Sequence, residues 1–275
     1  MKGKLYLVAT PIGNLEDITL RAINVLKEVD IIAAEDTRRT LKLLNHLEIK
    51  KPLESYYKEI EETKSDNLIN KILDGKNIAL VSDAGTPAIS DPGEVLVKKA
   101  IKNDIEIVPI PGACALINAL IASGMDTREF LFAGFLPVNK KEKKEKLERL
   151  KGNNSTLILY EAPHKLINTL NTILEIYGNR KIVLAREITK IHEEFIRGNI
   201  EDILQNCKEP KGEFVILIEP LEEKNDEFTN LSLADHYKVY EKQGLEKKEI
   251  IKRIAKDRNV NKNEIYKFFF KKEPR

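Results

Sequence analysis

The stretch "SDAGTPAISDPG", Ser82–Gly93, follows the apolar run "ALVS" at 79–82, which is typical of a buried strand. Within it, Gly85, Pro87, Pro92 and Gly93 occupy four of nine successive positions. Glycine permits backbone angles that other residues avoid, and proline fixes one angle, so these residues predict a compact loop with a fixed backbone. Fixed N–H and C=O groups can bind the edge of an adenine, a ribose or an amino-acid moiety. We therefore predict a ligand-binding loop.

Further apolar runs precede and follow this loop, and amphipathic helical patterns separate them. The runs lie at 5–9, 31–34, 105–110, 130–135, 156–161, 181–186 and 214–219. Continuous apolar runs are typical of parallel strands that are buried on both faces. Strands that alternate with helices predict an α/β fold. In such a fold, ligands bind in the loops after the carboxyl ends of the strands.

The chain has two predicted breaks. At "PIPGACA", 109–115, a strand ends in Pro-Gly and small residues begin a helix, so a cleft between two α/β halves is expected. After residue 220 a charged linker leads to three short helical patterns, the last two flanking "NVN" at 259–261. This resembles a helix-turn-helix, which binds nucleic acid in some proteins and is a plain packing unit in many others. We expect α/β domains at 1–112 and 113–222 and a small basic helical domain at 232–275.

Composition excludes several classes of protein. Among the 275 residues, Cys114 and Cys207 lie far apart and lack C-x-x-C spacing, which argues against a disulfide framework, a zinc site or a redox pair. The N-terminal apolar run has five residues and ends at Pro11, too short for a signal peptide or a membrane span. We expect a cytoplasmic protein with no membrane partner and no metal site.

Positive charge is concentrated in two segments. Residues 231–275 hold 13 Lys/Arg against 7 Asp/Glu, and residues 139–151 hold 7 against 3. Such segments suit a polyanion, usually nucleic acid, although a solvated helix face explains either one equally well. In the tail, Lys252, Arg253 and Lys256 are the candidate RNA contacts. Phe268–Phe270 cannot all face one side of a helix, so at least one is expected to be exposed or to meet a partner.

The first strand leaves the sheet through "TPIGN", Thr10–Asn14. Neither G-x-G-x-x-G nor G-x-x-x-x-G-K-S/T, whose backbone N–H groups bind phosphates, occurs there. This argues against nicotinamide-dependent and nucleotide-hydrolysing enzymes.

Seven motifs between Leu5 and Phe195 carry a family resemblance: "LVATPIGNLEDIT", "AAEDTRRT", "LVSDAGTPAISDPG", "PIPGACALINAL", "FLFAGFLP", "LILYEAPHKL" and "LAREITKIHEEF". Together they resemble the tetrapyrrole methylase superfamily, and more closely its bacterial enzymes that methylate a cytidine 2′-hydroxyl in small-subunit ribosomal RNA. The resemblance implies two α/β domains with S-adenosylmethionine in their cleft, a homodimer, and 16S ribosomal RNA or the small ribosomal subunit as substrate. S-adenosylmethionine carries no phosphate group, so its site needs no phosphate-binding loop.

Two other functions stay open: a small-molecule methylase of the tetrapyrrole type, and a non-catalytic RNA-binding assembly protein of the same fold. The basic tail favours an RNA substrate over a tetrapyrrole, which needs no phosphate-binding appendage. The intact cofactor loops argue against a non-catalytic protein.

The resemblance also implies which residues contact the cofactor: Pro11, Gly13, Asp83, Gly85, Thr86, Ala88, Ile89, Cys114, Ala115, Glu161, Ala162 and the segment Gly212 to Phe214. One position departs from the family pattern. Many relatives have G-G-D-P where this chain has Ala84 to Pro87, so the Asp of their motif is absent here. Whether Asp83 replaces that carboxylate stays open.

A ribose hydroxyl is a poor nucleophile, so a base or hydrogen-bond acceptor near the methyl group is expected. The candidate catalytic residues are Glu35, Asp36, Glu187 and Lys190, with Glu193 nearby. Either a lysine with a lowered pKa or a carboxylate can take the proton. The alternative for Glu187 and Glu193 is a surface ion pair with Lys190. Arg38 and Arg39 can hold an RNA phosphate, or Arg38 can neutralise Asp36. His164 is expected to cap a helix or line a wall.

Overall fold

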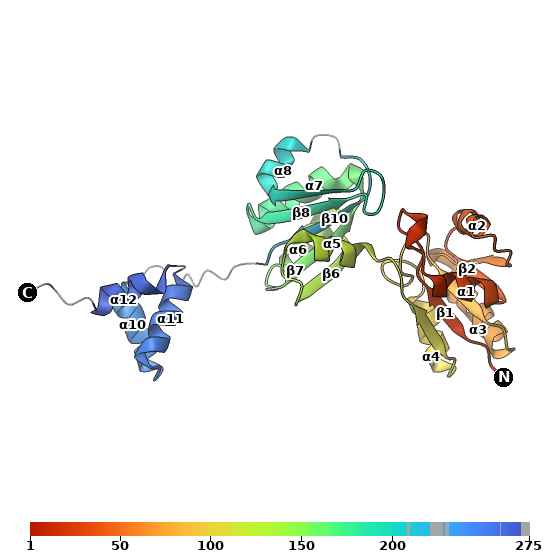
Figure 1. The fold of residues 1–275 in the computed structure, drawn as a ribbon, viewed down its shortest axis with the longest axis horizontal. Coiled ribbons are helices and arrows are strands. Elements are labelled where there is room, and N and C mark those ends of the chain that lie inside the picture. Colours follow the sequence, from red (N-terminus) through yellow and green to blue (C-terminus); the bar gives the residue numbers. More distant parts are fainter. Residues whose placement is uncertain (208–209, 221–227, 229–230, 259, 271–275) are drawn as a thin grey trace, which may run out of the picture. The chain divides into compact units, whose positions relative to one another are not determined.

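The computed structural model describes residues 1–207, 210–220, 228, 231–258 and 260–270. The chain divides into two compact units, Met1–Pro220 and Leu221–Arg275. The first unit contains two five-stranded sheets, coloured red to yellow and green to blue in Figure 1. The predicted boundary at residue 222 lies outside the described residues, and the boundary at residue 112 stays a prediction.

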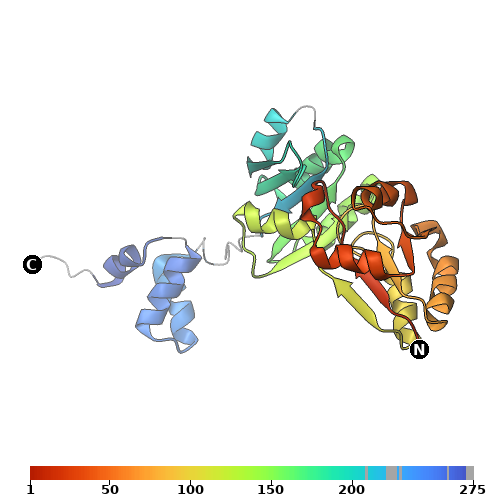
Figure 2. The ribbon, with the colours of Figure 1, turned by 45° about the vertical axis from the view of Figure 1, so that its right-hand side comes forward.

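The first sheet is entirely parallel, with the strand order β3-β2-β4-β1-β5. Its strands are β1 (Leu5–Val8), β2 (Ile31–Ala34), β3 (Leu53–Ser55), β4 (Ile78–Val81) and β5 (Ile107–Ile110). Its helices are α1 (Leu20–Glu28), α2 (Thr37–His46), α3 (Glu61–Leu73) and α4 (Glu94–Lys102), with short 3-10 turns at Leu15–Asp17 and Lys58–Ile60. Successive side chains of β4 alternate between two cores, Ala79 and Val81 facing α1 and α2, and Ile78 and Leu80 facing α3 and α4. Figure 2 shows these helices around the sheet.

The second sheet is mixed, with the strand order β6-β7-β10-β8-β9. Its strands are β6 (Phe130–Phe135), β7 (Thr156–Glu161), β8 (Lys181–Arg186), β9 (Glu194–Asn199) and β10 (Phe214–Ile218). Its helices are α5 (Ala115–Ser123) on one face, and α6 (Lys140–Leu150), α7 (Pro163–Tyr177) and α8 (Ile200–Asn206) on the other.

The prediction of parallel strands is wrong for this second sheet. Only β6 and β7 pair in parallel, whereas β10 runs antiparallel to both β7 and β8. An apolar run reports burial on both faces, and helices on both faces bury a central strand whatever its direction.

The second unit contains α10 (Leu233–Lys242), α11 (Lys247–Asp257) and α12 (Lys262–Phe270). Tyr240, Ile250 and Ile265 contribute to its small core. The last two helices lie where the sequence predicts a helix-turn-helix, although Asn259 of the turn lies outside the described residues. Phe268 is 61% exposed, as expected for one member of the phenylalanine cluster.

One basic residue of this unit, Arg258, forms hydrogen bonds within the unit itself. Arg258 donates a hydrogen bond from Nε to Nδ1 of the buried His236 at 3.1 Å, and another from Nη2 to the carbonyl of Phe228. The positive charge of the tail is therefore only partly available to a polyanion. Of the helices that the structure describes in either unit, none combines the length and apolarity that crossing a membrane requires.

Candidate active site

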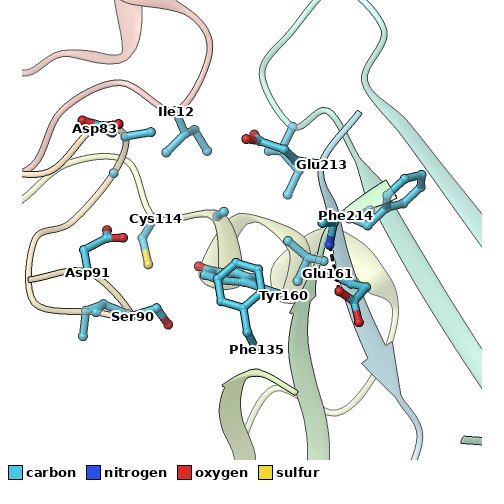
Figure 3. A pocket seen from close by; sticks show the side chains of 18 of the residues that line it. Ile12, Asp83, Ser90, Asp91, Cys114, Phe135, Tyr160, Glu161, Glu213 and Phe214 are labelled. Atoms are coloured by element: carbon cyan, nitrogen blue, oxygen red, sulfur yellow. Dashed lines mark hydrogen bonds between the residues drawn. The ribbon is translucent and has the colours of Figure 1, made fainter. Parts of the chain in front are cut away.

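A cavity of about 570 Å³ lies between the two halves of the first unit (Figure 3). The loop Ser82–Gly93 and Cys114 contribute to one side of its wall. The ends of β7, β8 and β10 contribute to the other side. The carboxyl ends of β7 and β8, as the sequence predicts for ligand binding, therefore meet the loop Ser82–Gly93 around one space, together with the amino end of β10.

The loop Ser82–Gly93 has the fixed backbone that its sequence predicts. Gly85 exchanges two backbone hydrogen bonds with Thr10, of 2.9 and 3.0 Å, which join this loop to the one after β1. The φ angles of Gly85, Ala88 and Ser90 are +85°, +64° and +69°. Because alanine and serine rarely adopt positive φ, this backbone is strained and is held by its surroundings.

A second strained loop faces the first from β8. Glu187 and Thr189 have φ angles of +48° and +66°. The backbone N–H of Asn14 donates to Oγ1 of Thr189 at 3.1 Å, and a Cβ atom on Gly13 would lie 2.4 Å from Cγ of Lys190. The glycine in "TPIGN" therefore permits close approach between the two halves, instead of forming a phosphate cradle.

Three of the carboxylates in the cavity wall, Glu35, Asp83 and Asp91, follow strands of the first sheet. Burial, followed by the nearby charge of Glu35, raises the pKa of Asp91 to about 6. Burial, followed by the charge of Asp83, also raises the pKa of Glu35. Arg39 offsets part of this charge, because its Nη1 lies 3.2 Å from Oδ2 of Asp83. The remaining negative charge suits a cationic ligand.

Aromatic and aliphatic side chains complete the wall. The ring of Tyr160 packs edge-on against Phe135, with ring centroids 5.6 Å apart, and Figure 3 shows both rings beside the cavity. The Tyr160 hydroxyl accepts a hydrogen bond from the backbone N–H of Leu116 at 3.1 Å. Burial raises the pKa of Tyr160 to about 12, so its hydroxyl stays neutral. Ile12 and Ile188 add apolar surface suited to an adenine ring.

Lys190 is held between two carboxylates. Its Nζ donates to Oε1 of Glu187 and to Oε2 of Glu213, at 3.0 Å each. Burial lowers the pKa of Lys190, but the hydrogen bonds to Glu187 and then Glu213 outweigh this effect, so its pKa is raised. A lysine that acts as a base needs a lowered pKa, and the pKa of Lys190 is shifted in the opposite direction. The structure contains the alternative, an ion pair between Lys190 and Glu187. Glu193 instead accepts a hydrogen bond from the backbone N–H of Thr189 at 2.6 Å.

Asp36 stabilises the start of α2. It accepts a hydrogen bond from the backbone N–H of Arg38 at 2.9 Å, and the Arg38 guanidinium lies 2.9 Å from its other oxygen. These hydrogen bonds from Arg38 lower the pKa of Asp36 to about 2. Of the two alternatives for Arg38, the structure contains neutralisation of Asp36. Asp36 is outside the cavity wall, whereas Arg39 is part of it.

The cavity wall includes most of the cofactor residues that the resemblance implies: Asp83, Gly85, Thr86, Ile89, Cys114, Ala115, Glu161, Ala162 and Phe214. Pro11, Gly13, Ala88 and Gly212 lie outside this wall. Ala88 shapes the strained loop, and a Cβ atom on Gly212 would lie 2.4 Å from Cγ of Glu187. Of the four catalytic candidates, Glu35 and Lys190 belong to the wall.

Sequence reasoning missed several wall residues: Ile12, Ser90, Asp91, Phe135 and Tyr160. Asp91 had a usable signal, because it is an acid inside the glycine- and proline-rich loop. The candidate RNA contacts Lys252 and Arg253 are exposed in the second unit, and the side chain of Lys256 lies outside the described part.

A smaller cavity of about 190 Å³ adjoins the first and shares Arg39 and Asp83 with it. Its wall includes the apolar Pro11, Leu15 and Leu43 together with Lys42.

The residues of the larger cavity fit S-adenosylmethionine. Carboxylates suit its positively charged sulfur, apolar side chains suit its adenine, and fixed backbone groups suit its polar edges. Within the described ranges, no cluster of three or more His, Cys, Asp or Glu residues has the arrangement of a metal site.

Comparison with known proteins extends this result. The family model for Tetrapyrrole (Corrin/Porphyrin) Methylases matches residues 4–204. The ribosomal RNA small subunit methyltransferase I of Halalkalibacterium halodurans is 51% identical over 274 residues, which cover 98% of this chain and 95% of the relative. The protein of that name from Thermotoga maritima is 45% identical over 218 residues, which cover 78% of this chain but 98% of the relative.

Solved structures show the same fold. The uroporphyrin-III C-methyltransferase of Thermus thermophilus, in complex with S-adenosyl homocysteine, superposes with a TM-score of 0.58 at 15% identity. The match covers 79% of this chain and 97% of that one. Motifs, cavity and full-length similarity agree: this chain belongs to the tetrapyrrole methylase family, in the group of the ribosomal RNA small subunit methyltransferases I.

Proposed function

We propose that this protein transfers a methyl group from S-adenosylmethionine to the ribose 2′-hydroxyl of a cytidine in 16S ribosomal RNA. The observation that carries the proposal is the 51% identity over 98% of the chain to a ribosomal RNA small subunit methyltransferase I, which includes every loop of the acidic cavity. The cavity supports the donor, and the name of the relative supports the acceptor.

S-adenosylmethionine, when bound, supplies an electrophilic methyl group on a positively charged sulfur. Asp83 and Asp91 provide negative charge for a cation in the cavity, and Glu161 provides a buried carboxylate in the same wall. The fixed loop Ser82–Gly93 holds its backbone groups in place before the donor arrives, so little ordering is needed on binding. Alignment of the reacting groups between the two walls supplies much of the rate acceleration.

Glu35 is the candidate that best fits proton acceptance. It is in the cavity wall and has a raised pKa, whereas the pKa of Asp36 is about 2 and Lys190 is held protonated. A base works best when its pKa is near the working pH. Lys190 then fits a different role, in which its charge orients an oxygen of the acceptor.

Replacing Lys190 tests that role. Lys190→Ala should slow methyl transfer by about 10²-fold or more while changing donor affinity little, since positioned charges of this kind act mainly in the transition state. Single-turnover rates and calorimetry on the same protein separate the two effects. Wild-type rates would rule Lys190 out.

The two alternative functions are less well supported. Similarity to a tetrapyrrole-type enzyme is 15% in identity and shows the fold, whereas the relatives at 45% and 51% have ribosomal RNA in their names. A non-catalytic protein has no need for a 570 Å³ cavity with strained loops on both sides.

We place RNA contacts at the smaller cavity beside the donor site. Arg39 and Lys42 are exposed cations there, and Pro11 and Leu15 provide apolar surface against which a base can pack. Phosphate contacts from arginine and lysine set the position of a nucleic acid on a protein. Arg38 adds little net charge on the same helix, because it is paired with Asp36.

The basic second unit is proposed as an accessory RNA contact through Lys252, Arg253 and Lys256. The 218 residues matched by the Thermotoga maritima relative are 98% of that protein but 78% of this chain, so this chain is longer by about the length of such a unit.

Homodimer formation is also proposed. Ile117 and Ile121 on α5 are 41% and 68% exposed, and Ile191 is 97% exposed, so the first unit presents apolar surface that a second copy can cover. Light scattering after size-exclusion chromatography should give twice the mass of the chain, and a monomer at micromolar concentration would contradict the proposal. Because ribosomal RNA is in the cytoplasm, we propose that compartment.

Calorimetry and labelled methyl transfer test the main proposal together. The wild-type protein should bind S-adenosylmethionine with one site per chain and transfer its methyl group to 16S RNA from a strain that lacks the enzyme. Gly85→Arg should abolish binding, because the side chain would enter the cavity at a residue with φ +85°. Gly152→Arg is the matched control, since nothing lies within 4 Å of a Cβ atom there. Transfer to a tetrapyrrole but not to RNA would overturn the proposal.

A further inference from the structure

One lysine of the basic segment 139–151 points inward. Lys143 of α6 is 4% exposed, whereas the side chain of its neighbour Lys141 is 86% exposed. Its Nζ donates to Oγ1 of Thr169 at 2.9 Å and to Oδ1 of Asn168 at 3.2 Å, both on α7. A buried ammonium group is costly unless it is hydrogen-bonded and matched by a negative charge.

The matching negative charge is on Glu161, which is hydrogen-bonded to the same Thr169 that accepts from Lys143. The hydroxyl of Thr169, which is fully buried, donates to Oε2 of Glu161 at 2.6 Å. A lysine ammonium has donors only, so the Thr169 oxygen must accept from Lys143 and its single hydrogen remains for Glu161. The chain of hydrogen bonds therefore has one direction, from Lys143 through Thr169 to the carboxylate.

Glu161 is at the cavity end of this chain. It is 5% exposed, belongs to the cavity wall, and is labelled beside the cavity in Figure 3. Its Oε1 accepts a hydrogen bond from the backbone N–H of Ala162 at 3.0 Å. Each carboxylate oxygen of Glu161 thus accepts one hydrogen bond from within the protein and has one further lone pair. The lone pairs that remain are available to hydrogen-bond donors in the cavity.

We propose that Lys143 is a positioning residue for the methyl donor, which it never touches. Through Thr169, it keeps the Glu161 carboxylate oriented to accept hydrogen bonds from hydroxyl or amino groups of S-adenosylmethionine. The inference rests on the proposed function, since it assigns the cavity to that donor. It also accounts for a buried lysine in a helix whose other described basic residues are at least partly exposed.

The test uses four variants of the full chain and calorimetry with both S-adenosylmethionine and S-adenosylhomocysteine. Lys143→Met and Thr169→Val should each weaken binding of both ligands by about tenfold, the usual effect of losing one charge-assisted hydrogen bond. Both ligands should respond equally, because they share their hydroxyl and amino groups and differ in the charge at sulfur. Thr169→Ser restores the hydroxyl and should restore affinity, and Lys141→Met is the control for loss of an exposed lysine.

A further variant separates positioning from packing. In a Glu161→Gln background the carboxylate is gone, so Lys143→Met should cause no additional loss of affinity. A loss as large as in the wild-type background would mean that Lys143 only packs the fold, and would overturn the inference. So would wild-type affinity in both Lys143→Met and Thr169→Val. Because Thr169→Val keeps the side-chain volume, the result does not depend on Lys143→Met remaining folded.

The same titrations separate this inference from the proposed function. No binding of either ligand to the wild-type protein would refute the donor assignment itself. Wild-type binding and methyl transfer, with unchanged affinity in the variants, would refute only the role of Lys143.

Discussion

Asp91 shows how the surroundings of one residue set its chemistry. It follows Ser90, whose positive φ turns the loop toward the cavity, and it shares the wall with Glu35. Burial and this neighbour make its ionised form unfavourable until a cation arrives. The glycine- and proline-rich loop was a usable signal for its place in the wall. Its raised pKa depends on burial and on the nearby Glu35, so it was not predictable from the sequence.

Donor binding should therefore depend on pH through Asp91. A cationic ligand favours the ionised carboxylate, so affinity for S-adenosylmethionine should fall as the pH drops through about 6. Asp91→Asn should weaken binding at pH 8 and remove most of this dependence. Calorimetry between pH 5 and pH 8 measures both effects, and an unchanged pH profile in Asp91→Asn would exclude the assignment.

The same variant should be more stable without ligand. The pKa of Asp91 in the folded protein, about 6, lies above the unfolded value, so its ionised form destabilises the fold above pH 6 and this effect disappears as the pH falls. Asp91→Asn should raise the free energy of unfolding by about 2 kcal/mol at pH 8 and have little effect near pH 4. Urea unfolding at the two pH values checks the sign. Lower stability at pH 8 would contradict the account.

Gly13 tests the close approach between the two halves. A Cβ atom there would lie 2.4 Å from Cγ of Lys190, so Gly13→Ala should displace the lysine from its carboxylate partners. We expect methyl transfer to fall by about tenfold or more, because small misplacements of an orienting group are costly. Gly152→Ala, with open space at the Cβ position, is the control. Equal single-turnover rates in the two variants would count against the contact.

At the scale of elements, the loop Ser82–Gly93 links local strain to binding. Gly93 has a φ angle of +146°, and a Cβ atom there would lie 2.9 Å from Cδ2 of Leu80. Ala88, by contrast, already carries a side chain at a φ angle of +64°. Substitutions at Gly93 and Ala88 should therefore have opposite effects on the stability of the protein.

Gly93→Ala should lower the free energy of unfolding by about 2 kcal/mol through strain and crowding. Ala88→Gly should leave it unchanged or raise it by about 0.5–1 kcal/mol, because glycine adopts positive φ without a steric penalty. Urea unfolding of both variants measures the difference. If the free energy of unfolding changed with the same sign in both variants, the backbone of this loop would not be strained as described.

The elements differ in how well sequence predicts them. Central strands such as β4 and β10 are continuous apolar runs, and the sequence located them within one residue. The edge strands β3 and β9 were missed, because "LES" and "EFIRGN" contain polar residues and form no continuous apolar run. Strand direction in the second sheet was also missed, since a central strand is buried equally in either direction.

At the scale of the whole molecule, the resemblance predicted several loops that line the larger cavity, because glycine and proline mark loops of fixed backbone in the sequence itself. Contacts between distant segments were not predictable in this way. The sequence gives no sign that Gly13 meets Lys190, or that Lys143 turns inward from a basic helix toward Glu161, because both depend on how the elements pack.

A chain that ends at Pro220 tests the division of labour between the two units. All residues of the larger cavity lie before that point, so donor affinity should be unchanged. Binding to 16S RNA should weaken, and its dependence on salt should become less steep. The reason is that the Lys and Arg side chains of the second unit no longer displace counterions from the RNA phosphates. The full chain with Lys252→Ala and Arg253→Ala should change in the same direction. RNA affinity and salt slope equal to the wild type would refute the RNA role of this unit.

The position of the transferred methyl group tests the central claim most directly. 16S RNA from a strain lacking the enzyme, both naked and in assembled small subunits, is incubated with the protein and labelled S-adenosylmethionine, and the product is hydrolysed with alkali. Methylation of a ribose 2′-hydroxyl removes the group that attacks the adjacent phosphodiester, so we predict one alkali-resistant dinucleotide that carries the label on cytidine. Label on a base, or an RNA that alkali hydrolyses completely, would contradict the account.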